Sequence, residues 1–124
     1  MKKLKIKINH KDNRGIISDI IENENINAIT LITIKKGSVR GNHYHKKTYQ
    51  WNYIISGKMK LVTKKRGLKK SVILYPGEIA VTVPYERHAL VGISSCKVLV
   101  FTKGPRGGKE YESDTFRLKK PIYK

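Results

Sequence analysis

Short alternating or β-branched runs, separated by turn signals, extend along almost all of the 124 residues. Residues 26–34 and 97–102 are rich in β-branched side chains, and residues 58–63 alternate between apolar and polar types. Apolar residues do not recur at the i, i+3, i+4 spacing of an amphipathic helix. Because short strands with frequent turns are typical of sandwiches and barrels, we predict an all-β fold.

Glycine and proline mark where the predicted strands end. Ser56-Gly57, Pro76-Gly77 and Pro84 each follow an apolar run, as turn-forming residues do. Two further segments carry specific expectations: residues 4–8 should form an edge strand, and the lysine-rich residues 64–70 should form a basic turn.

The length suits one domain with one hydrophobic core. After residue 103 the chain becomes rich in glycine and in basic and aromatic residues. We therefore predict a single domain over residues 1–124, with a β core over about 1–103. The remainder, residues 104–124, should form a C-terminal arm or flap.

The charge is strongly positive: 27 Lys and Arg against 9 Asp and Glu. Such a chain attracts polyanions without specificity. We see no helix-turn-helix, zinc-finger or RNA-binding pattern, so we expect no specific nucleic-acid partner. Two explanations of the excess positive charge then remain. The lysines are scattered over solvent-facing positions, or the protein binds a small substrate that carries phosphate.

Other features concern the compartment. No run approaches the ~20 apolar residues of a membrane span, and no signal-peptide pattern follows the basic N-terminus, so we expect no membrane partner. The one cysteine, Cys96, lies in an apolar run and indicates a reducing compartment. We predict a cytoplasmic protein.

The most informative site signal is a pair of histidines. His43 and His45 are two residues apart, so in a β-strand they project to the same side, roughly 7 Å apart along the strand. Gln50 follows five residues later, and His88 comes after Pro84. Imidazoles that face one space form either part of a metal cage or an acid/base pair, and the spacing alone leaves both open.

The order of these residues resembles the two motifs of the cupin superfamily. The matching positions are Gly41, His43, His45, Gln50, Gly57, Pro76, Gly77, Pro84 and His88. The resemblance implies a double-stranded β-helix, the jelly-roll barrel, with a site in its mouth. Gln50 stands where metal-binding cupins usually have glutamate, and a neutral amide is a poorer ligand for a divalent cation.

A narrower resemblance concerns residues 40–50, Arg-Gly-Asn-His-Tyr-His-Lys-Lys-Thr-Tyr-Gln. This run is similar to the signature of cupins that isomerise nucleotide-linked keto-sugars, the dTDP-sugar 3,4-ketoisomerases, in which two histidines move protons without a metal. The turn at residues 12–15, Asp-Asn-Arg-Gly, is similar to one in the related 3,5-epimerases. The resemblance implies an isomerase or epimerase that acts on a nucleotide-linked deoxy keto-sugar in surface-polysaccharide precursor synthesis.

The resemblance also suggests roles for individual residues. His43 would be the base and His45 would return or relay the proton, because histidine titrates near neutral pH. Tyr53 is a possible acid if it faces inward. The predicted substrate-binding residues are Arg14 and Arg40 for the diphosphate, Trp51 for stacking on the base, and Gln50 and His88.

Two other functions remain open. The first is a metal-dependent cupin, such as a dioxygenase, in which His43, His45, Gln50 and His88 bind Zn, Mn, Fe or Ni. The second is a non-catalytic module that binds sugars or anions. The leading interpretation needs no cofactor. We also expect a homodimer, since open jelly-roll sheets leave edges that need cover.

Overall fold

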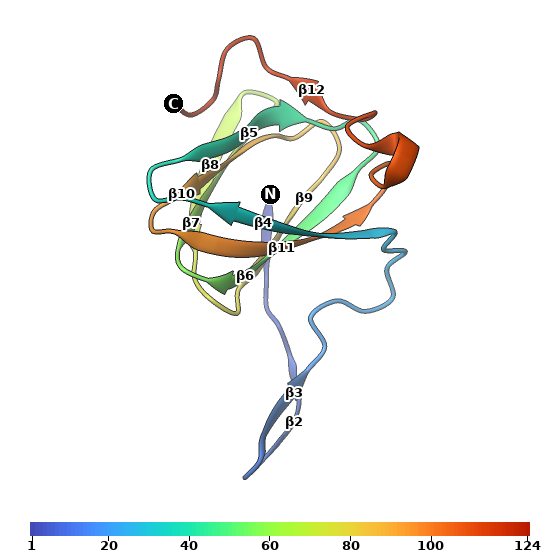
Figure 1. The fold of residues 1–124 in the computed structure, drawn as a ribbon, viewed down its shortest axis with the longest axis vertical. Coiled ribbons are helices and arrows are strands. Elements are labelled where there is room, and N and C mark those ends of the chain that lie inside the picture. The colour runs from blue at the N-terminus through green and yellow to red at the C-terminus, as the bar shows by residue number, and fades with distance from the viewer.

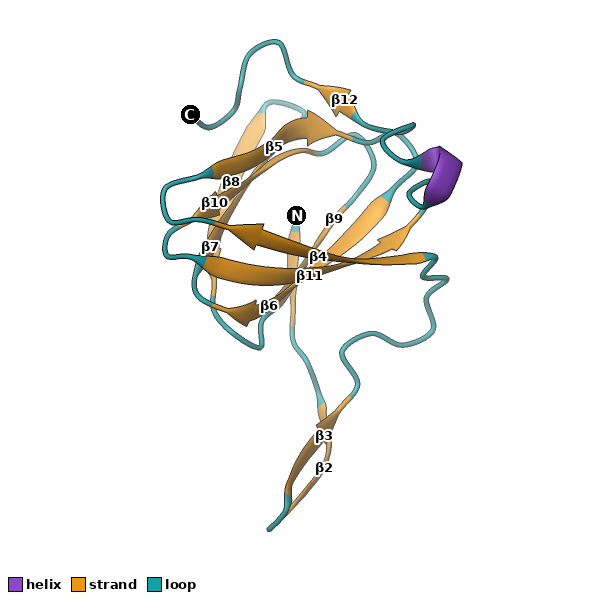
Figure 2. Ribbon diagram, in the orientation of Figure 1, coloured by secondary structure: helices purple, strands orange, loops and turns teal.

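Two five-stranded antiparallel sheets face each other and form a jelly-roll barrel (Figure 1). The computed structural model describes all residues, 1–124. Its single helical element is one short 3-10 turn, η1 (Gly108–Glu110), and the rest is strand and loop (Figure 2). The prediction of an all-β fold is confirmed.

The first sheet has the strand order β1-β9-β6-β11-β4. Its strands are β1 (Lys2–Leu4), β9 (Ile79–Thr82), β6 (Tyr49–Ser56), β11 (Cys96–Lys103) and β4 (Ala28–Ile34). The second sheet has the order β12-β5-β10-β7-β8. Its strands are β12 (Phe116–Arg117), β5 (Val39–Tyr44), β10 (Arg87–Gly92), β7 (Met59–Lys65) and β8 (Leu68–Leu74). A separate two-stranded hairpin joins β2 (Ile8–Asp12) to β3 (Gly15–Ser18).

The hydrophobic core lies between the two sheets. Along β11, alternate residues are buried, because successive side chains of a strand point to opposite faces. The side chains of Ile54, Leu61, Leu74 and Val98 are completely buried there. Cys96 belongs to the same cluster as an unpaired thiol. Two of its members, Leu90 and Val100, also line the cavity described below, so the core and the cavity are continuous.

The expected edge strand at residues 4–8 is wrong, because β1 ends at Leu4 and β2 begins at Ile8. The hairpin formed by β2 and β3 projects away from the barrel (Figure 1). The basic turn expected at residues 64–70 is also wrong, since β7 and β8 pair as far as Lys65 and Leu68. Leu68, Lys69 and Lys70 are exposed in succession at the start of β8, so a run of charged residues does not by itself end a strand.

A C-terminal flap, defined here as residues 104–118, crosses one end of the barrel (Figure 1). Gly104 has a φ of +136°, and a Cβ there would lie 2.8 Å from Oγ1 of Thr48. Glycine therefore lets the flap leave β11 close against the turn between β5 and β6. Beyond the flap, Ile122 and Tyr123 pack on the outer face of the second sheet. No helix in the structure has the length and apolarity needed to cross a membrane.

Candidate active site

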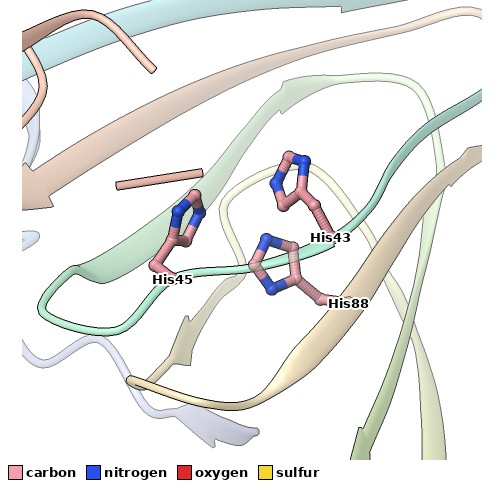
Figure 3. Close-up of side chains that lie close together, drawn as sticks. All are labelled: His43, His45 and His88. Carbon is pink, nitrogen blue, oxygen red and sulfur yellow. The ribbon is translucent and has the colours of Figure 1, made fainter. Parts of the chain in front are cut away.

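Three histidines turn their rings toward one space inside the barrel (Figure 3). His43 lies on β5, His45 directly follows that strand, and His88 lies on the adjacent strand β10. The ring centroid of His43 is 4.9 Å from that of His45 and 4.7 Å from that of His88. His45 and His88 are buried, and His43 is half-buried.

Backbone geometry brings His43 and His88 side by side. The two residues are direct partners in the pairing of β5 with β10, and the register shifts immediately after His88. At that shift Gly41 has a φ of +89°, and a Cβ there would lie 2.9 Å from the carbonyl oxygen of His88. A side chain at position 41 would push the strands apart, so the glycine of the motif sets the distance between the histidines.

Backbone carbonyls fix the orientation of two rings. Nδ1–H of His45 donates to the carbonyl oxygen of Asp114 over 2.8 Å, and Nδ1–H of His88 donates to that of Glu86 over 3.0 Å. Because a carbonyl only accepts, Nδ1 carries the proton in both rings, and Nε2 is the nitrogen left for chemistry. Nε2 of His45 lies 3.1 Å from Oε1 of Gln50, so a protonated His45 can donate to both oxygens.

His43 has different surroundings. Its Nδ1 is buried and has no hydrogen-bond partner. Burial, followed by repulsion from His45 and Arg117, lowers the pKa of His43 to about 4. Burial also holds the pKa of His88 well below its usual value. His43 is therefore a neutral imidazole at neutral pH and can accept a proton.

The histidines line a cavity of about 500 Å³, a size typical of small-molecule sites. Gln50 and Asn52 of β6 form one wall and Arg40 of β5 lies at the rim. The flap provides another wall, with the side chains of Arg106, Tyr111, Glu112, Thr115 and Arg117.

The cavity brings together five of the eight predicted site residues: Arg40, His43, His45, Gln50 and His88. Arg14 lies instead at the tip of the projecting hairpin, where it forms an ion pair with Asp12 over 2.6 Å. Trp51 and Tyr53 do not line the cavity. Alternation along β6 turns them to the opposite face from Gln50, and Trp51 is buried beside Tyr49. The inward orientation required of a catalytic Tyr53 is not met.

Asp114, which is not among the predicted site residues, docks the flap onto the barrel. Its buried carboxylate accepts hydrogen bonds from the backbone N–H groups of Lys46 and Lys47 and from the hydroxyl of Thr48, at 3.1, 2.8 and 2.7 Å. Together with the hydrogen bond between its carbonyl oxygen and His45, this carboxylate attaches the flap to the turn that begins at His45. The sequence signal for this role is weak, because Asp114 is one of three acidic residues in a tail that mixes acidic, basic and aromatic types.

Comparison with known proteins identifies one matching family. The model of the polysaccharide biosynthesis C-terminal domain matches residues 10–101. A search of curated proteins finds no significant match.

Solved structures share the whole fold. The sugar 3,4-ketoisomerase QdtA from Thermoanaerobacterium thermosaccharolyticum, in complex with TDP, superposes with a TM-score of 0.79 at 23% identity, covering 95% of this chain and 88% of that one. Its histidine-to-asparagine variant in complex with TDP-4-keto-6-deoxyglucose superposes with a TM-score of 0.78 at 22% identity, covering 94% of this chain and 86% of that one.

Two further structures extend this comparison. A 3,4-ketoisomerase from Helicobacter canadensis gives a TM-score of 0.79 at 25% identity, covering 94% of this chain and 90% of that one. The dTDP-4-dehydrorhamnose 3,5-epimerase from Sulfolobus tokodaii gives a TM-score of 0.70 at 16% identity, covering 91% of this chain and 72% of that one. The predicted cupin-type jelly roll is confirmed.

Proposed function

This chain belongs to the family of polysaccharide biosynthesis C-terminal domains, and we propose that it isomerises a dTDP-linked deoxy keto-sugar by proton transfer. The observation that supports this most is the convergence of His43, neutral and without a partner, with His45, held between two acceptors. An acid/base pair of this kind suits proton transfer next to a ketone. The jelly-roll relatives that carry out such chemistry share the fold.

For a 4-keto sugar, the reaction is an internal redistribution of protons. His43 accepts the proton from C3 while the C4 oxygen is protonated, which gives an enediol. The C3 hydroxyl then loses its proton as C4 gains one, and the product is the 3-keto sugar. His45 supplies and recovers the proton at oxygen. No oxidant or reductant is needed, so the proposal requires no cofactor.

Isomerisation is favoured over 3,5-epimerisation by the contents of the cavity. An epimerase of this class is expected to pair its histidine base with a tyrosine acid, but the predicted candidate, Tyr53, lies outside the cavity. Tyr111, the tyrosine that does line the cavity, belongs to the flap and is exposed. Two histidines side by side match a base and an acid that serve adjacent carbons.

The test is to incubate the purified protein with TDP-4-keto-6-deoxyglucose in D₂O and follow the sugar by NMR. We expect a 3-keto product with deuterium at C4. Deuterium at C3 and C5 with inversion would show epimerisation instead. Binding without any exchange would favour the non-catalytic binding module.

A metal-dependent cupin is the second candidate, because one ring nitrogen from each of His43, His45 and His88 lies within 4.8 Å of the others. Three imidazoles can hold Zn, Mn, Fe or Ni at about 2.1 Å, and a bound ion would polarise a substrate oxygen. The fit is partial, since the metal would replace the contact between His45 and Gln50. Metal analysis of protein purified without chelator separates the candidates: full activity in metal-free protein excludes this one.

We also propose that the protein forms a homodimer and works in the cytoplasm. An isolated two-stranded hairpin is marginal in water, and Ile8, Ile16 and Ile17 of the hairpin are exposed. A second copy would cover these side chains, and would give Arg14 a neighbouring subunit to contact. Light scattering during gel filtration would give twice the chain mass for the dimer, and the Ile16→Lys/Ile17→Lys double variant should be a monomer.

A further inference from the structure

A second pocket lies on the outside of the barrel, at the turn that joins β7 to β8 and the turn that joins β9 to β10. It has a volume of about 430 Å³. We call it the outer pocket, and its lining residues are Tyr44, Lys65, Arg66, Pro84, Tyr85 and Arg87. Because side chains alternate along a strand, Tyr44 points to the opposite face of β5 from His43. No residue lines both the outer pocket and the histidine cavity, so the two sites are separate.

Stacked aromatic rings lie beside the outer pocket. The ring of Tyr44 stacks with the ring of Phe116 at a centroid distance of 5.4 Å and with the ring of Tyr85 at 6.3 Å, and both pairs are within 24° of parallel. Tyr85 is nevertheless 57% exposed. A mostly exposed ring with one stacked neighbour offers its other face to a flat ring of a ligand.

The outer pocket is also positively charged. Lys65, Arg66 and Arg87 line it together with no carboxylate, and none of the three forms an ion pair. The guanidinium of Arg87 lies 5.7 Å from the centroid of the Tyr44 ring. Glu86 does not neutralise this charge, because it is 2% exposed and its carboxylate accepts a hydrogen bond from a backbone N–H of the same turn. Unpaired cations beside an exposed ring favour a ligand that is both flat and anionic.

Two residues of the outer pocket have backbone conformations that favour smaller residues. Arg66 and Gly67 form the two-residue turn of a hairpin, with φ of +52° and +76°, where Asn-Gly is the preferred pair. Tyr85 has a φ of +66°, which is rare for a bulky side chain. The backbone N–H of Tyr85 donates to the carbonyl oxygen of His45 over 2.6 Å and holds the turn. Large side chains at two such positions, both facing one pocket, indicate a role in binding rather than in folding.

We propose that the outer pocket binds a free nucleotide, with the base stacked on Tyr85 and the phosphate groups bound by the three cations. A nucleobase continues the aromatic stack, and the planar guanidinium groups match phosphate oxygens. The volume is in the range of small-molecule sites, which favours a free nucleotide over a nucleic-acid strand. Stacking is tolerant of base identity, so any nucleobase should be accepted. The inference does not rest on the isomerase reaction.

The test is an NMR titration with ADP and with adenosine, in which the amide signals of the residues lining each site distinguish the outer pocket from the histidine cavity. Arg66→Asn should lower ADP affinity at the outer pocket about tenfold or more and leave adenosine affinity unchanged, because a charged hydrogen bond to phosphate is lost. Tyr85→Asn should weaken both ligands, because stacking is lost.

Stability separates binding from a structural role. Asparagine adopts positive φ more easily than arginine or tyrosine, so in Arg66→Asn and Tyr85→Asn the urea midpoint should stay the same or rise. Two matched controls should leave ADP affinity unchanged. Lys36→Asn also removes a cation that precedes a turn glycine, and Tyr75→Asn removes another exposed tyrosine, and both lie outside the outer pocket.

Several results would overturn the inference. One is ADP that shifts the signals of the histidine cavity alone, and another is unchanged ADP affinity at the outer pocket in the Arg66→Asn/Tyr85→Asn double variant. Weaker ADP binding accompanied by a lower urea midpoint in both single variants would assign these side chains a structural role. An adenine oligonucleotide that binds the outer pocket much more tightly than ADP would make the ligand a nucleic-acid strand instead.

Discussion

The histidines and the flap arginines share one cavity but are held in different ways. His43 and His88 lie on paired strands, and backbone carbonyls fix the rings of His45 and His88. Arg106 and Arg117 extend from a segment with one 3-10 turn and one two-residue strand. Proton transfer requires atoms placed within fractions of an ångström, whereas long cationic side chains can attract an anion from many positions. We call the three histidines and the strands that hold them the rigid region. The rigid region should therefore control turnover, and the flap should control binding of the anionic part of the substrate.

The strongest test of this division is His43→Asn. Asparagine is of similar size but cannot act as a base near neutral pH, so we expect kcat to fall by about 10³-fold, within the usual range for losing a general base. TDP affinity should stay within about twofold, because His43 binds the sugar end and charge binds the diphosphate. Deuterium exchange and calorimetry measure the two quantities. His10→Asn, on the exposed hairpin, is the control, and unchanged exchange in His43→Asn would contradict the assignment.

Asp114→Ala should break the separation between the two regions, because this residue joins them. The variant removes the acceptor for the N–H groups of Lys46 and Lys47 and for the hydroxyl of Thr48. We expect kcat/KM to fall about 10- to 100-fold and the free energy of unfolding to fall by about 2 kcal/mol, as for other charged hydrogen bonds. Urea denaturation and steady-state kinetics measure these effects.

Asp114→Asn retains an acceptor oxygen and should recover part of both losses. If Asp114→Ala lowered stability while kcat and KM stayed at wild-type values, the flap would be a structural cover without influence on His45.

The pH dependence sharpens the description of the rigid region. The base works in its neutral form, which predominates above its pKa, and burial lowers the pKa of His43 to about 4. An ordinary histidine would be only about 3% neutral at pH 5, whereas His43 should remain about 90% neutral. We therefore expect kcat/KM to fall by less than about threefold from pH 7 to pH 5. An acid limb with a midpoint near 6.5 would contradict this environment for His43.

The same shift predicts how stability depends on pH. Because the folded-state pKa of His43 lies below the unfolded value, the unfolded chain binds more protons in acid. Stability from this residue is complete above about pH 6.5 and falls as the pH drops towards about 4. In His43→Asn the urea midpoint should change less over that interval than in wild type.

The smallest effect should come from Tyr53→Phe. Tyr53 lies on β6 but does not line the cavity, so loss of its hydroxyl should leave kcat within about twofold. The matched variant Tyr111→Phe removes a hydroxyl that does line the cavity. If Tyr53→Phe abolished turnover and Tyr111→Phe did not, the orientation of β6 in the active protein would differ from the one described.

The sequence by itself determined the fold class and the part of the site that lies on the strands. Alternation and turn residues predict strands, since burial of one face requires a period of two, and the ordered motif predicts that His43, His45, Gln50 and His88 meet. The same period of two places Tyr53, three residues after Gln50 on β6, on the opposite face from the site, so its exclusion also follows from the sequence once Gln50 faces the cavity. Only the tertiary structure decided that the flap closes the cavity. Asp114 meets Lys47 across 67 positions in the chain, and such a contact follows from the path of the whole backbone, which no local pattern encodes.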